Sequence, residues 1–144
     1  MRIRIKRFDR ELPLPRYMTA GAAAFDLVAR TAVAIPARST GYIPLNIALE
    51  VPDGHTLLIA PRSSTHKKGL IMANSVGIID PDFRGDGDEI HAAYHNQTDR
   101  EVRIERGERI AQGLIKKIER VEWDEVDSLG NPTRGGFGTT GENI

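Results

Sequence analysis

The stretch GYIPLNIALEV, residues 41–51, is the clearest indication of fold class in the chain. Its aliphatic side chains stand at every second position from Ile43 to Val51, and other residue types occupy the positions between them. Successive side chains of a β-strand point to opposite faces of its sheet, so this period of two indicates a strand with one buried face. The sequence Pro52-Asp53-Gly54 that follows is a typical turn and ends the segment.

Other alternating segments lie on both sides of this one. They are RIRIKRF (2–8), TLLIAP (56–61), EIHAAYH (89–95), EVRIERG (101–107) and RIAQGLIKKIERVEW (109–123). Turn-forming stretches separate them, the chain holds eight prolines and fourteen glycines, and no long 3.6-residue period occurs. The segment 107–118 also fits a helix, but its isoleucines favour a strand. We therefore expect an all-β sandwich or barrel with one short helical turn near residues 64–70.

Length and charge restrict the classes of function. A chain of 144 residues suits one domain. Twenty basic residues balance twenty acidic ones, so no net field attracts nucleic acid or a membrane surface. The chain has no cysteine, which excludes disulfides and thiolate metal sites. No apolar stretch of signal-peptide or membrane-spanning length follows the basic N-terminus, and we expect a cytoplasmic location, or the host cytoplasm or nucleus for a viral chain.

The C-terminal stretch RGGFGTTG, residues 134–141, has the composition of a phosphate-binding loop. Its glycines let the backbone approach a ligand, its threonines add hydroxyl donors, and Arg134 adds a positive charge. Phe137 suits stacking on a nucleobase. The apolar alternation stops at Asn131, so we expect a folded domain over residues 1–130 and a flexible arm over residues 131–144. A disordered linker is the alternative interpretation.

Residues 60–65, APRSST, follow an apolar run and form a possible anion-binding corner. Arg62 offers a planar fork of donors, and Ser63 and Ser64 add hydroxyl groups beside backbone N–H groups. A purely structural turn is the alternative interpretation of this short motif.

The stretch NSVGIIDPDFRGDGDEI, residues 74–90, places Asp80 at the end of an apolar run. A carboxylate in such a position is a candidate general base toward water. The alternative is a structural β-turn, because type I turns favour Asp at the first position and Pro at the second.

The acidic residues after Asp80 do not fit a calcium loop. Arg84 stands at position five and His91 at position twelve, where an EF-hand needs oxygen ligands. Asp86, Asp88 and Glu89 are therefore interpreted as solvated turn residues or ion-pair partners. His91 and His95 would lie about 13 Å apart on a strand, too far to share one zinc ion.

Taken in order, five motifs resemble those of the trimeric dUTP diphosphatase family. They are AAAFDL (22–27), PRSST (61–65), GIIDPDFRG (77–85), GERIAQ (107–112) and RGGFGTTG (134–141). The resemblance implies a jelly-roll protomer in a homotrimer, with three active sites that each draw on all three subunits. It also implies Mg²⁺-dependent hydrolysis of dUTP to dUMP and pyrophosphate, which keeps uracil out of DNA and supplies dUMP for thymidylate synthesis.

The same resemblance implies roles for individual residues. Asp80 would be the general base, and Asp26 would hold the magnesium ion through water. The substrate-binding residues would be Arg62, Ser63, Ser64 and Gln112 on the triphosphate, Asn74, Gly77 and Ile79 around uracil, Phe83 under the deoxyribose, and Arg134, Phe137, Gly138, Thr139 and Thr140 in the arm.

Two aromatic positions differ from the family pattern. Phe25 and Phe83 stand where the family usually has tyrosine. The second exchange removes a phenol oxygen beside the sugar, so it bears on selectivity against UTP.

Two rival functions fit parts of the pattern. A dCTP deaminase shares the fold and an Arg-Ser-Ser turn but would need a glutamate base. A non-catalytic nucleotide-binding regulator would keep the fold without turnover.

Overall fold

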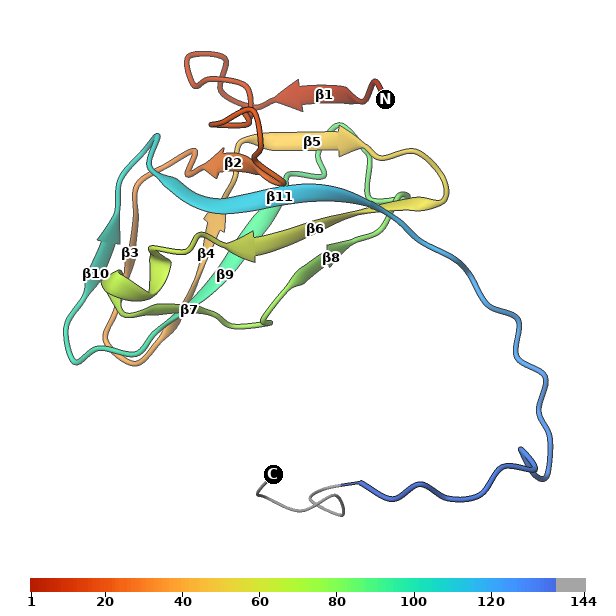
Figure 1. The fold of residues 1–144 in the computed structure, drawn as a ribbon. Helices are drawn as coiled ribbons and strands as arrows, with labels where there is room; N and C mark the ends of the chain where they lie inside the picture. The colour runs from red at the N-terminus through yellow and green to blue at the C-terminus, as the bar shows by residue number, and fades with distance from the viewer. Residues whose placement is uncertain (137–144) are drawn as a thin grey trace.

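The computed structural model describes residues 1–136 and is built of strands, apart from one short 3₁₀ turn (Figure 1). The strands are β1 (Arg4–Arg7), β2 (Phe25–Val28), β3 (Val33–Ile35), β4 (Thr40–Pro44), β5 (Ile47–Glu50), β6 (His55–Pro61), β7 (Leu70–Met72), β8 (Gly77–Ile79), β9 (His91–Asn96), β10 (Val102–Ile104) and β11 (Arg109–Lys117). The turn η1 (Thr65–Lys68) lies where the sequence predicts a helical turn. The all-β class is confirmed.

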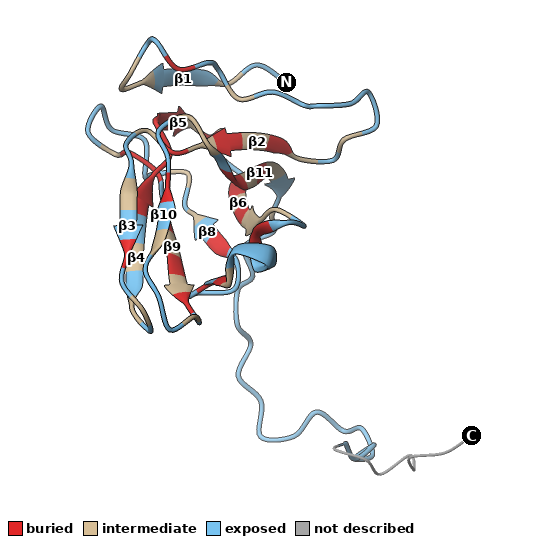
Figure 2. Cartoon of the chain, turned by 90° about the vertical axis from the view of Figure 1, so that its left-hand side faces the viewer, coloured by how far each residue is buried: buried red, intermediate tan, exposed pale blue. Residues whose placement is uncertain are grey.

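Four small antiparallel sheets surround one apolar core. Their strand orders are β2-β11-β6-β8, β4-β9-β7, β1-β5 and β10-β3. The buried residues of these strands face one another in the interior, and the exposed residues lie outside (Figure 2). The core contains the fully buried Leu57, Ile59 and Tyr94. Burying alternate aliphatic side chains from several sheets is the main favourable contribution to folding.

Residues 41–51 form two strands rather than one. Asn46 interrupts the alternation with a left-handed φ of 68°, so β4 pairs with β9 whereas β5 pairs with β1. The Asn46 side chain is buried and donates to the Asp9 carbonyl at 3.0 Å, while its own oxygen accepts the Asp9 N–H at 2.7 Å. The backbone N–H of Asn46 donates to Glu89. These bonds satisfy a polar residue at the point where the chain changes sheets.

Strand β11 ends earlier than the alternation over residues 109–123 predicts. Lys117 pairs with His55, the first residue of β6, and Ile118 makes a further backbone bond to the Gly54 carbonyl. Beyond this point β6 offers no further partner. Residues 119–136 have no regular structure, are exposed, and extend away from the sheets (Figure 1). In the described part of the chain, no helix is long and apolar enough to span a membrane.

Candidate active site

Adjacent strands bring Asp26, Arg62 and Gln112 together at one end of the four-stranded sheet. On β11, Gln112 pairs with Asp26 of β2 on one side and with Ala60 of β6 on the other. Arg62 follows the end of β6 and donates from Nε to Asp26 Oδ1 at 3.2 Å. Gln112 Nε2 donates to the carbonyl of Pro61 at 3.0 Å. The sheet register therefore gathers residues from three of the five motifs, and we name this group the phosphate corner.

Ser63 and Ser64 leave the sheet beside the phosphate corner. Both are exposed, and Ser64 precedes the turn η1. A pocket of about 210 Å³ opens here, and its lining includes Arg62, Ser64, Lys68 and Arg109. Glu108 also lines this pocket and pairs with Lys68 at 2.7 Å, so Arg62 and Arg109, with the Ser64 hydroxyl, are the groups that favour an anionic ligand. The anion-binding role of Arg62, Ser63 and Ser64 stays a prediction with geometric support.

A buried tyrosine of β9 forms a hydrogen bond with Ile110, one of the residues that line this pocket. Tyr94 donates its hydroxyl to the carbonyl of Ile110 at 2.8 Å. Burial raises the pKa of the Tyr94 phenol to about 12, and a hydrogen bond with Thr65 opposes part of that effect. The phenol therefore stays protonated at neutral pH and links β9 to β11.

The second group of predicted residues lies on and around β8, and we name it the base loop. Asn74 sits in the turn before β8, where Ser75 has a φ of 62° and its N–H donates to the Met72 carbonyl. A Cβ atom added to Gly77 would lie 3.8 Å from Asn74 Nδ2, so the asparagine amide stays close to the glycine backbone. The carbonyl of Ile79 accepts a hydrogen bond from Thr56 Oγ1 at 2.8 Å. This edge of the sheet thus presents an exposed amide and backbone groups, which suit recognition of a flat polar ring.

Asp80 begins a β-turn, as the alternative interpretation of its sequence proposes. The N–H of Phe83 donates to the Asp80 carbonyl at 3.1 Å. The turn also leaves Asp80 exposed, and Phe83, three residues later, is 41% exposed. A structural turn and a catalytic carboxylate are therefore compatible here. The role of Asp80 as a base stays a prediction.

The phosphate corner and Asp80 lie near opposite ends of β6. Ile79 pairs with Leu57, five residues before Arg62. Because a strand rises about 3.3 Å per residue, roughly 17 Å of β6 separates these two positions. Figure 1 shows β8 beside β6 and running in the opposite direction. A general base must lie within hydrogen-bond reach of the attacking water, so one chain does not bring Asp80 to a water beside an α-phosphate held at Arg62.

The arm carries Arg134, which is exposed at the far end of the described chain. The other predicted arm residues, Phe137, Gly138, Thr139 and Thr140, lie outside the described residues. Contacts between Arg134 and the rest of the site stay a prediction.

The acidic residues after Asp80 stabilise the fold through ion pairs and hydrogen bonds within a turn. Glu89 is buried and accepts two hydrogen bonds from Arg30, each at 2.8 Å. Asp88 accepts the N–H of Gly85 at 2.6 Å, and Asp86 pairs with Lys6. The interpretation of these residues as turn and ion-pair partners is confirmed. This interpretation agrees with the sequence comparison, in which the residues after Asp80 do not match the ligand positions of a calcium-binding EF-hand loop.

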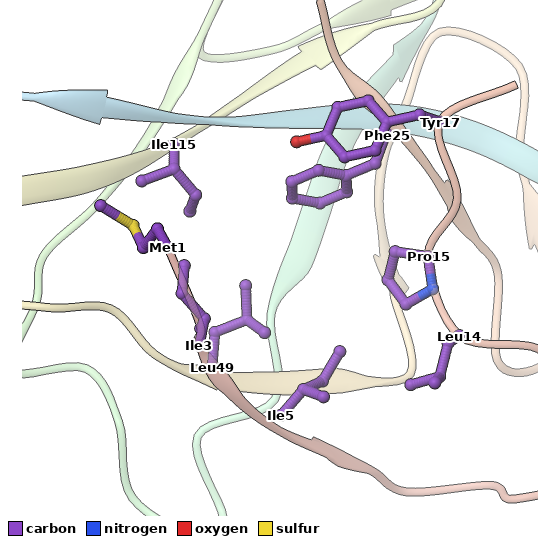
Figure 3. A pocket seen from close by; sticks show the side chains of 9 residues that line it. All are labelled: Met1, Ile3, Ile5, Leu14, Pro15, Tyr17, Phe25, Leu49 and Ile115. Carbon is purple, nitrogen blue, oxygen red and sulfur yellow. The ribbon is translucent and has the colours of Figure 1, made fainter. Parts of the chain in front are cut away.

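An apolar groove of about 320 Å³ has no residue of either group in its lining (Figure 3). Ile3 and Ile5, Leu49 and Ile115 point into it from the region of β1, from β5 and from β11. Phe25 closes one side and packs edge-on against Tyr17, with ring centroids 5.7 Å apart. Phe25 therefore acts as a packing residue here. The groove lining carries no charged side chain, so it does not suit a nucleotide phosphate.

Arg109 is a site residue that the sequence did not single out. It donates to Asp26 Oδ2 at 2.9 Å, and its carbonyl accepts from Arg62 at 3.2 Å. Its place in GERIAQ, three residues before Gln112, is the available sequence signal. That spacing alone would put the two side chains on opposite faces of a regular strand.

Comparisons with known proteins agree with this geometry. A family model described as dUTPase matches residues 10–141. A deoxyuridine 5'-triphosphate nucleotidohydrolase of Thermobifida fusca is 40% identical over 146 residues, covering 98% of this chain and 79% of the relative. The enzyme of that name from Dictyoglomus turgidum is 38% identical, with 98% of this chain and 99% of the relative covered.

Solved structures give the same assignment. The crystal structure of dUTPase from Streptococcus mutans has 30% identity and a TM-score of 0.75, covering 83% of this chain and 98% of the other. A mutant dUTPase of Staphylococcus bacteriophage 80alpha with dUpNHpp has 21% identity and a TM-score of 0.85, covering 98% and 99%. This second likeness concerns the fold, which is all-β and jelly-roll-like. The chain belongs to the dUTPase family.

Proposed function

We propose that this chain hydrolyses dUTP to dUMP and pyrophosphate. The observation that carries the proposal is the match of the dUTPase family model to residues 10–141, nearly the whole chain. The phosphate corner and the base loop add structural support, because each presents the type of group that one part of dUTP requires. By removing dUTP, the reaction would keep uracil out of DNA and supply dUMP for thymidylate synthesis.

In the proposed reaction, Asp80 takes a proton from a water molecule that attacks the α-phosphorus in line. The new bond joins the water oxygen to the α-phosphorus, and the bond to the bridging α,β-oxygen breaks as pyrophosphate leaves. A positioned general base contributes about 10²- to 10⁴-fold to such a step. Charge neutralisation and orientation supply most of the remainder.

The other predicted site residues would bind the substrate. Arg62, Ser63, Ser64 and Gln112 would hold the triphosphate from the phosphate corner. Asn74, Gly77 and Ile79 would form the uracil pocket, and Phe83 would pack under the deoxyribose. Backbone groups at β8 would discriminate uracil from cytosine through fixed donors and acceptors, and a tight wall would exclude the methyl group of thymine.

We further propose a homotrimer in which each active site draws on all three copies. The separation of Asp80 from the phosphate corner supports this, because a site that contains both must combine different chains. The irregular stretch before the arm, residues 119–130, gives a second reason: Val121, Val126 and Leu129 are exposed on it, and Trp123 is 91% exposed. The groove of Figure 3 is a further apolar surface that one copy leaves open. Exposed apolar surface of this extent is typical of an interface.

The arm over residues 131–144 would close on the nucleotide of another copy, while residues 1–130 form the domain that carries it. Phe137 would stack on uracil, and Arg134, Gly138, Thr139 and Thr140 would hold the β- and γ-phosphates. Closing such an arm excludes water and completes the site, and opening it releases products.

Magnesium is the metal that we propose for this site. Among residues 1–136 there is no group of three or more His, Cys, Asp or Glu side chains that could hold a metal ion. Magnesium suits a site with few protein ligands, because it binds through one or two carboxylates, substrate phosphates and retained water. Each oxygen of Asp26 accepts one guanidinium N–H and keeps a lone pair for a metal-bound water. The ion would neutralise triphosphate charge.

A substrate panel tests the proposed function. With magnesium, we expect pyrophosphate from dUTP, and values of kcat/KM for dCTP and dTTP that are lower by about 100-fold or more. UTP is expected to be discriminated less strongly than dCTP, because Phe83 lacks a phenol oxygen beside the sugar. The measurements are pyrophosphate release and, for dCTP, ammonia release.

Two outcomes would contradict the proposal. Ammonia from dCTP would indicate a deaminase, and nucleotide binding without pyrophosphate release would indicate a non-catalytic regulator.

A further inference from the structure

Two hydrogen bonds fix the guanidinium of Arg62. Its Nε donates to Asp26 Oδ1 at 3.2 Å, and one terminal nitrogen donates to the carbonyl of Arg109 at 3.2 Å. A guanidinium has five N–H groups, so three remain for a ligand. The direction in which those three point depends on Asp26 and Arg109.

Arg109 also forms a hydrogen bond with Asp26, whose carboxylate accepts a hydrogen bond from Arg62. Its guanidinium donates to Asp26 Oδ2 at 2.9 Å, while Arg62 occupies Oδ1. The side chain of Asp26 is 13% exposed, that of Arg62 is 26% exposed, and that of Arg109 is 45% exposed. Arg109 therefore covers a nearly buried carboxylate from the solvent side and restricts its rotation.

A β-bulge places Arg109 on this face of the sheet. The β2–β11 register shifts between Arg109 and Ala111, so that Arg109 pairs with Val28 while Gln112 pairs with Asp26. Ile110 and Ala111 are both buried as a result, although they are neighbours in the strand. Bulges commonly redirect a side chain next to a functional site. Here the bulge puts Arg109 and Gln112 on the face that carries Asp26.

The charges around the corner depend on Arg109 as well. Two guanidiniums and one carboxylate give the trio of Arg62, Arg109 and Asp26 a net charge of about +1. Nearby Lys68 is paired with Glu108 at 2.7 Å and adds little to that charge. Without Arg109, Asp26 would neutralise Arg62 and compete with a phosphate for its donors.

We infer that Arg109 is a positioning residue, which orients Arg62 through Asp26 and thereby sets the affinity of the phosphate corner for a triphosphate. The inference rests on the proposed function and adds a residue to its substrate-binding machinery. Because the interaction is with bound phosphate rather than with the attacking water, its loss should appear mainly in KM and in ligand affinity.

The test compares Arg109→Gln and Arg109→Lys with the unmodified full-length protein. We expect Arg109→Gln to raise KM for dUTP by about 10-fold and to weaken dUpNHpp binding by a similar factor, with kcat changed less than about threefold. Arg109→Lys keeps one charged donor for Asp26 and should recover part of the loss. Titration calorimetry with dUpNHpp, with and without magnesium, separates binding from turnover.

Arg103→Gln is the matched control. Arg103 lies on the neighbouring strand β10 and forms an exposed ion pair with Glu105 at 2.7 Å, so its loss should change neither KM nor binding. In an Asp26→Asn background, Arg109→Gln should have a much smaller effect, because the carboxylate that transmits it is gone.

Two results would overturn the inference: an unchanged KM and affinity in Arg109→Gln, or a full effect that persists in the Asp26→Asn background. Failure of the unmodified protein to release pyrophosphate from dUTP would instead refute the proposed function. The two failures are therefore distinguishable.

Discussion

Asp80→Asn is expected to lower kcat for dUTP by about 10³-fold, because asparagine cannot accept the proton of the attacking water. The affinity for dUpNHpp should stay within about threefold of the original, since the base acts in the transition state. The turn should persist, because its hydrogen bond uses the backbone carbonyl of residue 80 and the N–H of Phe83. Single-turnover kinetics and calorimetry measure the two effects.

The matched control is Asp82→Asn in the same exposed turn. It removes a neighbouring carboxylate of equal charge and should leave kcat nearly unchanged. Should Asp80→Asn abolish dUpNHpp binding while turnover per bound ligand stays normal, Asp80 would be a structural turn residue.

Removal of residues 134–144 is expected to lower kcat/KM for dUTP by about 100-fold or more, because a lid that positions phosphates and excludes water would be lost. Folding and assembly should be retained, since β11, the last strand within residues 1–136, ends at Lys117. The measurements are steady-state kinetics, thermal unfolding and light scattering. A truncation before Glu142 keeps RGGFGTTG and serves as the control, with activity close to that of the full chain.

An unfolded product from the longer truncation would count against a lid, because it would make the tail part of the fold. Unchanged activity would exclude these residues from the site.

The sequence predicted the fold class because apolar alternation determines which face of a strand is buried. The segment TLLIAP became β6, and EIHAAYH became most of β9. Strands β3, β7 and β8 have three residues each, which is too few for an alternation of apolar and polar residues to predict a strand. The end of β11 depends on where its partner β6 begins, so the local pattern past Lys117 was misleading.

Asn46 shows why the break in residues 41–51 was missed. The aliphatic period continues through Leu45 and Ile47, both buried, although β4 ends at Pro44 and β5 begins only at Ile47. The break depends on contacts with Asp9 and Glu89, which are distant in sequence. Asparagine tolerates left-handed φ values better than most residues, which was the one local signal.

The sequence predicted candidate site residues one by one but not their arrangement. Arg62 and Asp80 each stand in a motif of suitable chemistry, and the family resemblance assigned their roles. Their separation along β6 follows from the β6–β8 register, which no motif encodes. Arg109 was missed because a register shift in β11 determines its face.

We propose that dUTP is hydrolysed in sites that combine different copies of this chain. The most direct measurement mixes two impaired variants, Asp80→Asn and Arg62→Gln, refolds them together in equal amounts, and follows pyrophosphate release from dUTP. In a shared site, an intact Asp80 from one copy meets an intact Arg62 from another in about a quarter of the sites after random assembly. We predict recovery of about a quarter of the original activity. If the mixture is no more active than its two components, Asp80 and Arg62 act within one chain or not in one site, and the account is wrong.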